Sequence, residues 1–149
     1  MSFTSESHRA KVLVIEDDPM VLELITTRLE LSGYRTYQAR NGSEGLRRLA
    51  DIRPDAVVLD INMPVMDGFE VLRLMQQHRV GAPPPTLVLT ARNRPEDVKA
   101  AISLGARDFI SKPFNDAQLI ARVGRLLRKA PRSAEQPPPG STPPQILDS

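Results

Sequence analysis

Three carboxylates in this sequence follow directly on two short apolar segments. Asp60 ends the run AVVLD at residues 56–60, and Glu16 and Asp17 follow the run KVLVI at residues 11–15. Apolar runs of this length, bounded by turn-forming residues, are typical of strands buried on both faces of a parallel sheet. A single acid at such a place is equally typical of an ordinary turn. Acids after two parallel strands, however, would meet where open sheets carry their functional residues.

Two further strand ends carry a hydroxyl and an amine. The segment 85–91 has Thr90 near its end, and the segment 107–111 is followed by Lys112. If these strands are parallel neighbours of the first two, all of these groups converge on one edge of the sheet. Clustered carboxylates repel one another unless a cation offsets them, and ligands that are all oxygen favour a hard ion such as Mg²⁺. The sequence therefore predicts a divalent cation beside the acids.

The same groups suit the transfer of a phosphoryl group. A divalent cation, an ammonium and a hydroxyl can neutralise the oxygens of a phosphoryl group while Asp60 acts as the nucleophile. A site for a softer metal is disfavoured, because the chain has no cysteine and its two histidines, His8 and His78, are not near the acids.

Strand and helix patterns alternate along the chain. One further strand is expected over residues 34–39. Helices are expected over residues 19–32, 42–51, 68–79, 95–104 and from 116 onward. The sequence thus predicts a single α/β domain with a doubly wound, five-stranded parallel sheet, (βα)₅. The side chains expected to face the sheet are Val21, Leu24, Ile25, Leu29, Leu46, Leu49, Ala50, Phe69, Leu72, Met75, Val98, Ala101, Ile102, Leu119, Ile120, Val123, Leu126 and Leu127.

Length and composition fit one globular unit and a polar tail. The chain has 149 residues, 40% of them hydrophobic, which is enough for one core. We expect a flexible N-terminus over residues 1–10, one domain over 11–130, and over 131–149 a proline-rich segment that is either a disordered tail or a linker. No apolar run approaches the ~18 residues that cross a bilayer, and no secretory signal begins the chain, so a cytoplasmic location is expected.

Four motifs in order resemble those of one protein family. They are the acidic run EDD at residues 16–18, VVLDINMPVMDG at 57–68, TA at 90–91 and KPF at 112–114. Each lies at an expected strand end, and together they resemble the receiver domain of two-component response regulators, the CheY-like family. The resemblance implies a signalling switch rather than an enzyme, a phosphoacceptor that assists its own aspartyl phosphorylation and dephosphorylation.

The resemblance also implies roles for the acids. Asp60 matches the phosphoacceptor. Asp17 matches the direct ligand of Mg²⁺ (or Mn²⁺), Glu16 the acid that acts through water, and Asn62 a residue that offers its backbone carbonyl to the metal. The acidic pair could instead be Asp17 and Asp18. We favour Glu16 and Asp17, because an acid directly before a proline is already a good helix start.

Other positions match groups around the phosphoryl oxygens. Thr90 and Lys112 match side chains that contact these oxygens, and the backbone amides of Asn62 and Ala91 are expected to add hydrogen bonds. Thr90 and Phe109 match the pair that changes position when the domain is phosphorylated. Phe109 could also simply fill the core, which an apolar ring does better than a tyrosine.

The expected partners also follow from the resemblance. The phosphoryl group would come from a sensor histidine kinase or a histidine phosphotransfer protein. The output to a downstream target or effector domain would pass through the helix 95–104, the next strand and the last helix. Similar receivers dimerise through this face, with Asp108 and Arg122 at positions that often pair. Arg107 departs from the acid common at its position, so a homodimer and a stand-alone regulator both stay open.

Two other functions fit the sequence less well. A phosphatase of the haloacid-dehalogenase type also forms an aspartyl phosphate, but it needs a second Asp two residues after the nucleophile, where this chain has Asn62. Direct binding of nucleic acid by the basic end of the last helix is disfavoured. Cations there complement the helix dipole, and no recognition-helix motif accompanies them. This basic run consists of Arg122, Arg125, Arg128, Lys129 and Arg132.

Overall fold

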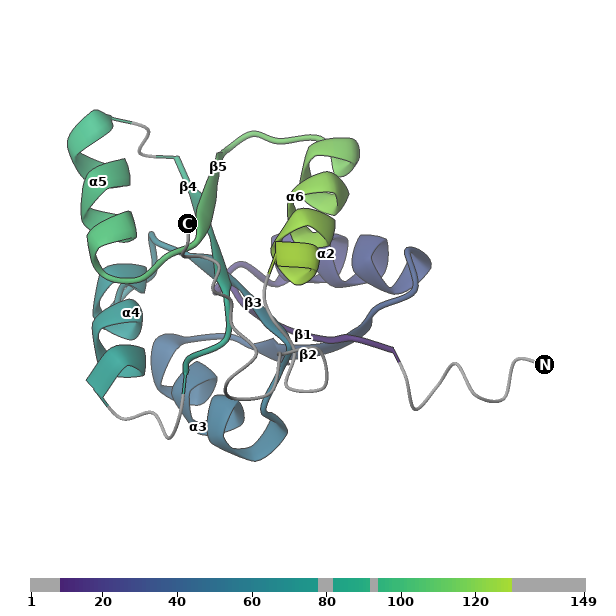
Figure 1. Ribbon diagram of the computed structural model, residues 1–149, viewed down its shortest axis with the longest axis horizontal. Coiled ribbons are helices and arrows are strands. Elements are labelled where there is room, and N and C mark those ends of the chain that lie inside the picture. The colour runs from purple at the N-terminus through teal and green to yellow at the C-terminus, as the bar shows by residue number, and fades with distance from the viewer. Residues whose placement is uncertain (1–8, 78–81, 92–93, 130–149) are drawn as a thin grey trace, which may run out of the picture.

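Five parallel strands form one sheet in the part of the chain that the structure describes (Figure 1). The computed structural model describes residues 9–77, 82–91 and 94–129. The strands are β1 (Lys11–Ile15), β2 (Arg35–Ala39), β3 (Ala56–Asp60), β4 (Thr86–Thr90) and β5 (Asp108–Ser111), in the spatial order β2-β1-β3-β4-β5. The chain passes from β1 to β2 on one side and returns to β3 on the other. The carboxyl ends of β1 and β3 therefore flank the crevice where ligands bind in such sheets.

Among the described residues, five helices cover the two faces of this sheet. They are α2 (Pro19–Leu31), α3 (Gly42–Ile52), α4 (Gly68–Gln77), α5 (Pro95–Ser103) and α6 (Asp116–Lys129). Helices α2 and α6 lie on one face, and α3, α4 and α5 lie on the other (Figure 1). The expected doubly wound α/β architecture is confirmed.

The core is aliphatic, and the sheet divides it into two layers. Val12 and Val14 of β1 pack in the layer beneath α2 and α6, whereas Leu13 and Ile15 pack in the opposite layer. Successive side chains of a strand point to opposite faces, and all four are fully buried. Burial on both faces is the physical reason for the continuous apolar runs.

Side-chain caps mark the starts of α2 and α6. The Asp18 carboxylate accepts hydrogen bonds from the amides of Met20 (2.9 Å) and Val21 (3.3 Å). At α6, the Asn115 side chain accepts from the amide of Gln118 (2.8 Å), and the Gln118 side chain accepts from the amide of Asn115 (3.0 Å). Such reciprocal bonds form a capping box. Both caps follow the carboxyl ends of strands and fix the direction in which the chain leaves the sheet.

Three side chains that were expected to face the sheet lie on the surface instead. Leu24 of α2 is 48% exposed, Ile102 of α5 is 47% exposed, and Ala50 of α3 is exposed. Helix α2 has apolar residues on nearly every side, so its pattern does not define one buried face, and Leu22 and Thr26 take the buried positions. Ala50 and Ile102 directly follow Leu49 and Ala101, which pack in the core. One residue turns the helix by about 100°, so Ala50 and Ile102 point away from the sheet.

Some predicted features lie outside the described residues. These are the N-terminal residues 1–8, the end of the helix predicted to reach residue 79, and the proline-rich segment 131–149. In the described ranges, no helix is both long enough and apolar enough to cross a membrane.

Candidate phosphoryl-transfer and metal site

The carboxyl ends of four strands lie side by side at one edge of the sheet. The register pairs Ile15 with Leu59, Asp60 with Leu89, and Thr90 with Ser111. Residues that end or follow β1, β3, β4 and β5 therefore share one rim, although they come from distant parts of the sequence.

Three acids form a compact cluster at this rim. Glu16, Asp17 and Asp60 each offer one carboxylate oxygen, and these oxygens lie within 4.8 Å of one another. Glu16 and Asp60 are each only 1% exposed, and Asp17 is half-buried. Asp18 is used differently, because its carboxylate caps α2. The structure thus groups Glu16, rather than Asp18, with Asp17 and Asp60.

Lys112 brings one ammonium group to the two buried acids. Its Nζ atom lies 3.2 Å from Asp60 Oδ1 and 3.4 Å from Glu16 Oε1. Backbone amides add two further hydrogen bonds, from Asn62 to Asp60 Oδ1 and from Asp18 to Glu16 Oε2, both at 3.2 Å. Both carboxylates are therefore held in place by one distant ammonium and by a backbone amide two residues further along the chain.

Burial and crowding change the acid–base properties of these groups. Desolvation, and then the nearby Asp60 carboxylate, raise the pKa of Glu16 to about 7. Desolvation also raises the pKa of Asp60, although Lys112 and the Asn62 amide act in the opposite direction. Burial acts to lower the pKa of Lys112, but attraction to Asp60 and Glu16 outweighs it, so this pKa is raised. Without a further cation, one ammonium must offset all the acids.

The donor set of this rim fits a hard divalent cation. The three clustered side chains supply oxygen atoms only, and these are close enough together to contact one ion. A second positive charge would remove the repulsion that helps to raise the pKa of Glu16. Mg²⁺, the predicted cofactor, and Mn²⁺ both favour such oxygen ligands. Binding of the metal by the Asn62 backbone carbonyl stays a prediction.

Thr90 and Phe109 lie on neighbouring strands beside the acids. Thr90 ends β4 and is 4% exposed, and Ala91, which follows it, is exposed. Phe109 of β5 pairs with Val88, so it lies two residues before the partner of Thr90 and on the same face of the sheet. Phe109 also packs against the apolar layer beneath α3, α4 and α5. It therefore fills core space next to Thr90, and its part in a switch stays a prediction.

Gly68 has a structural role at this site that was not predicted from the sequence. Its amide donates to the carbonyl of Ile61 at 2.9 Å, and a Cβ atom at this position would lie 2.7 Å from both the Asp60 carbonyl oxygen and Ile61 Cα. Only glycine lets α4 begin against the backbone that carries Asp60. The only hint in the sequence was the Asp-Gly pair at residues 67–68, which predicts the start of a helix but does not predict the close contact with the backbone of Asp60.

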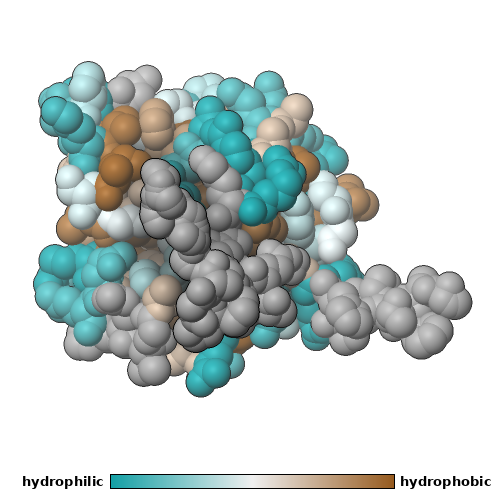
Figure 2. Space-filling view, in the orientation of Figure 1, coloured by the Kyte–Doolittle hydropathy of each residue, from teal (hydrophilic) through white to brown (hydrophobic). Residues whose placement is uncertain are grey.

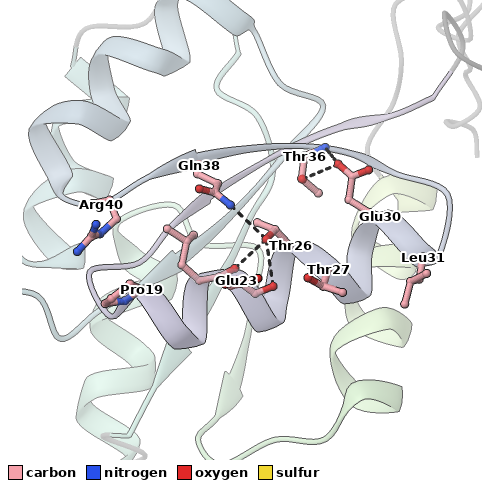
Figure 3. Close-up of a pocket in the computed structure, with 10 residues that line it drawn as sticks. Pro19, Glu23, Thr26, Thr27, Glu30, Leu31, Thr36, Gln38 and Arg40 are labelled. Atoms are coloured by element: carbon pink, nitrogen blue, oxygen red, sulfur yellow. Dashed lines mark hydrogen bonds between the residues drawn. The ribbon is translucent and has the colours of Figure 1, made fainter.

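A hollow away from the rim lies between α2 and the edge strand β2 (Figure 3). Its volume is about 590 Å³, and it is lined by none of the clustered acids, nor by Thr90 or Lys112. The Glu30 carboxylate accepts from the amide (3.0 Å) and the hydroxyl (2.7 Å) of Thr36, and Gln38 donates to Thr26 at 3.3 Å. The polar groups that line the hollow thus form hydrogen bonds with one another. The Glu30 carboxylate also binds the Thr36 amide, which is a backbone donor of the edge strand. The site of interest is therefore the rim.

Comparison with known proteins gives matches over most of the chain. A sequence model of the response regulator receiver domain matches residues 12–124. The chain is 44% identical over 119 residues to the transcriptional regulatory protein PrrA of Mycobacterium leprae, which covers 80% of this chain and 50% of PrrA. It is 35% identical over 122 residues to the DNA-binding dual master transcriptional regulator RpaA of Synechocystis, with 82% and 51% covered. The chain thus spans about half the length of these curated relatives.

Solved structures agree with the sequence matches. The chemotaxis protein CheY4 of Vibrio cholerae superposes with a TM-score of 0.74 at 32% identity, covering 80% of this chain and 99% of that one. A putative response regulator from Chloroflexus aurantiacus gives a TM-score of 0.76 at 30% identity, covering 81% and 99%. With its acids, hydroxyl and amine gathered at the rim of such a fold, the chain belongs to the receiver domain family of two-component response regulators.

Proposed function

We propose that this chain is a phosphorylation-activated switch in which Asp60 accepts a phosphoryl group from a sensor histidine kinase or a histidine phosphotransfer protein. The observation that carries the proposal is the contact of Lys112 with the buried Asp60 inside a cluster of acids. Keeping several acids buried around one ammonium is unfavourable for stability, so the cluster is better explained by chemistry than by folding.

In the proposed transfer, an oxygen of Asp60 attacks the phosphorus of a phosphohistidine, and the bond between phosphorus and the imidazole nitrogen breaks. Lys112 and Thr90 then bond to the phosphoryl oxygens, and the amides of Asn62 and Ala91 add further donors. These groups stabilise charge that develops during transfer. The domain in this way assists its own modification and needs no turnover of a separate substrate.

Glu16, Asp17, Asp60 and the carbonyl of Asn62 would hold the cation, with Glu16 acting through water. A bound Mg²⁺ or Mn²⁺ supplies positive charge to the phosphoryl oxygens. The half-buried position of Asp17 suits a direct ligand that solvent can reach. The pKa of the buried Glu16 is raised to about 7, and a bound cation would favour its ionised form.

The new phosphoryl dianion is proposed to bias a two-state element. Thr90 moves toward the phosphoryl group, and Phe109 moves into the space that Thr90 leaves. Because Phe109 lies in β5 between α5 and α6, the change reaches the surface of these three elements. Added charge thereby selects one of two arrangements of the output face.

The donor is proposed to dock on α2. This helix begins two residues after Asp17, and its outer side carries Met20, 80% exposed, and Leu24, 48% exposed. Large apolar side chains exposed beside a reactive site are more typical of a protein interface than of a helix face that contacts only solvent.

The receiver unit is proposed to extend over residues 11–130. Relatives that are about twice as long carry names of transcriptional regulators. In a longer protein, the output face would accordingly control an effector domain that acts in transcription.

Incubation with acetyl phosphate and Mg²⁺, followed by intact mass measurement, tests the phosphoacceptor. We expect a gain of one phosphoryl group that is stable in acid and labile in base, and that is lost in Asp60→Asn but kept in Asp51→Asn, a change of an exposed acid on α3. An adduct that persists in Asp60→Asn contradicts the assignment. Steady turnover of a phosphomonoester would instead favour the phosphatase alternative.

A further inference from the structure

A shallow hollow of about 280 Å³ lies where β5 begins and α6 passes beside it. It is lined by Arg107, Asp108, Arg125 and Leu126, and we call it the Arg107 notch. Hydrophilic side chains predominate over α6 in Figure 2. Arg107 precedes β5, whereas Lys112 follows it, so the notch is separated from the acidic rim by the length of the strand.

Positive charge exceeds negative charge at the Arg107 notch. Arg122 Nη1 lies 3.1 Å from Asp108 Oδ1, and Arg125 Nη2 lies 3.0 Å from Asp108 Oδ2, so both oxygens of this acid are already paired. Arg107 is exposed and forms no ion pair with any residue that the structure describes. Three guanidinium groups therefore lie near one carboxylate, which pairs with only two of them.

We propose that the Arg107 notch, which belongs to the output face of the proposed function, binds an acidic segment of a partner protein, whose carboxylates pair with Arg107 and Arg125. Guanidinium groups bind carboxylates through paired hydrogen bonds of defined geometry. The Arg125 side chain is 51% exposed and Arg107 is exposed, so a partner can reach both guanidinium groups, although at Arg125 it competes with Asp108. The excess of positive charge makes an acidic partner the complementary one.

The same charges argue against two other occupants. A second copy of the chain on this face would bring two sets of three guanidinium groups together against only two carboxylates, both already engaged, and like charges oppose such contact. A nucleic acid backbone needs a row of free cations along its phosphates. Of the three arginines at the notch, Arg107 alone has no acid partner among the described residues, and Arg122 and Arg125 share Asp108, so the notch offers a short cationic site and not a row of free cations.

The notch also contacts the backbone of Phe109. The amide of Phe109 donates to Asp108 Oδ1 at 2.8 Å, and its carbonyl accepts from Arg122 Nη1 at 2.7 Å. An acid that binds Arg125 would compete with Asp108, the same side chain that accepts from the Phe109 amide. Under the proposed function, Phe109 is the switch residue. In that case occupation of the notch changes the free energy of Asp60 phosphorylation, and phosphorylation changes the affinity of the notch by the same amount and with the same sign.

The test titrates the isotope-labelled full chain with a hexaglutamate peptide, without Mg²⁺ or phosphodonor, so that its result does not depend on Asp60 chemistry. We expect amide resonance shifts confined to β5 and α6, absent with hexaglutamine and weakened by added salt. Arg107→Asp should weaken binding about tenfold or more. Arg47→Asp makes the same change of charge at an exposed site on α3 and should leave binding unchanged.

Three outcomes would overturn the proposal. Shifts spread evenly over the surface, or equal weakening by both variants, would show a general charge effect only. Tighter binding of a DNA duplex of equal charge to β5 and α6 would show a nucleic-acid surface instead. A dimer seen by sedimentation that Arg107→Asp disrupts would show that a second copy occupies the notch.

Discussion

The ammonium of Lys112 lies 3.4 Å from Glu16 Oε1, although the two residues are 96 positions apart in the sequence. The same ammonium lies 3.2 Å from Asp60 Oδ1, so two buried carboxylates depend on one cation. The charge balance of the rim can therefore be changed in three ways: by protonation of Glu16, by removal of Lys112, or by addition of a divalent ion.

The free energy of unfolding should fall as the pH rises from about 4.5 to about 7 when divalent cations are absent. The pKa of Glu16 rises from 4.5 to about 7 on folding. The folded protein thus holds this proton more tightly than the unfolded chain, and the stability it contributes below pH 4.5 is lost as the pH passes 7. A shift of this size corresponds to on the order of 3 kcal/mol. Urea unfolding at a series of pH values measures the effect.

The Glu16→Gln variant is the control for this prediction. Glutamine keeps the shape of the side chain but does not titrate, so the fall in stability over this pH range should be much smaller. Equal pH dependence in both proteins would show that other groups cause it.

Replacing Lys112 with methionine should destabilise the protein more at pH 8 than at pH 5. At pH 8 the change leaves ionised Glu16 and Asp60 without their cation, and we expect a loss of about 1–3 kcal/mol. At pH 5 Glu16 holds a proton, so the loss is smaller. Lys99→Met, the same change at an exposed site on α5, should stay within about 0.5 kcal/mol of wild type. Equal losses at the two pH values would contradict this account.

Addition of Mg²⁺ should stabilise the folded protein, and more at pH 8 than at pH 6, because Glu16 must lose its proton before the acids hold an ion. At a concentration ten times the Kd, the gain should be about 1.4 kcal/mol. Asp17→Asn should abolish it, and Asp51→Asn, at an exposed site on α3, should not. Thermal unfolding with and without Mg²⁺ gives the comparison. A gain that survives in Asp17→Asn would place the ion elsewhere.

The sequence predicted the rim better than it predicted the helix faces. The strands β1, β3 and β4 are almost wholly buried, and such strands leave a clear apolar run that fixes where Glu16, Asp60 and Thr90 must lie. Lys112 follows β5, which is only partly buried. The face of α2 was predicted less well, because apolar residues surround the helix and Leu24 is as apolar as Leu22. Gly68 shows a second limit, since a contact between backbone atoms leaves no apolar pattern in the sequence.

Val65, in the loop after Asp60, should be replaceable by glycine with a gain in stability. Its φ angle is +69°, and its side chain is fully exposed. The left-handed conformation costs a residue with a Cβ atom about 1–2 kcal/mol, and glycine loses about 0.5–1 kcal/mol through its freer unfolded state. The expected net gain is about 0.5–1 kcal/mol, measured by urea unfolding. Val65→Ala keeps the Cβ atom and should gain less. A loss of stability in Val65→Gly would show that the loop is not strained.

Two glycine-to-alanine changes should have opposite effects. At Gly68 the new Cβ atom would lie 2.7 Å from backbone atoms of Asp60 and Ile61, which cannot move without shifting the phosphoacceptor. We expect a loss of about 1–3 kcal/mol and slower phosphorylation by acetyl phosphate. At Gly124, inside α6, the nearest atom is the end of the flexible Arg128 side chain at 3.1 Å. There alanine should add about 0.5–1 kcal/mol through its higher helix propensity, with the phosphorylation rate unchanged. Unfolding curves and adduct formation rates for the two variants give the comparison, and equal rates would show that Gly68 does not position Asp60.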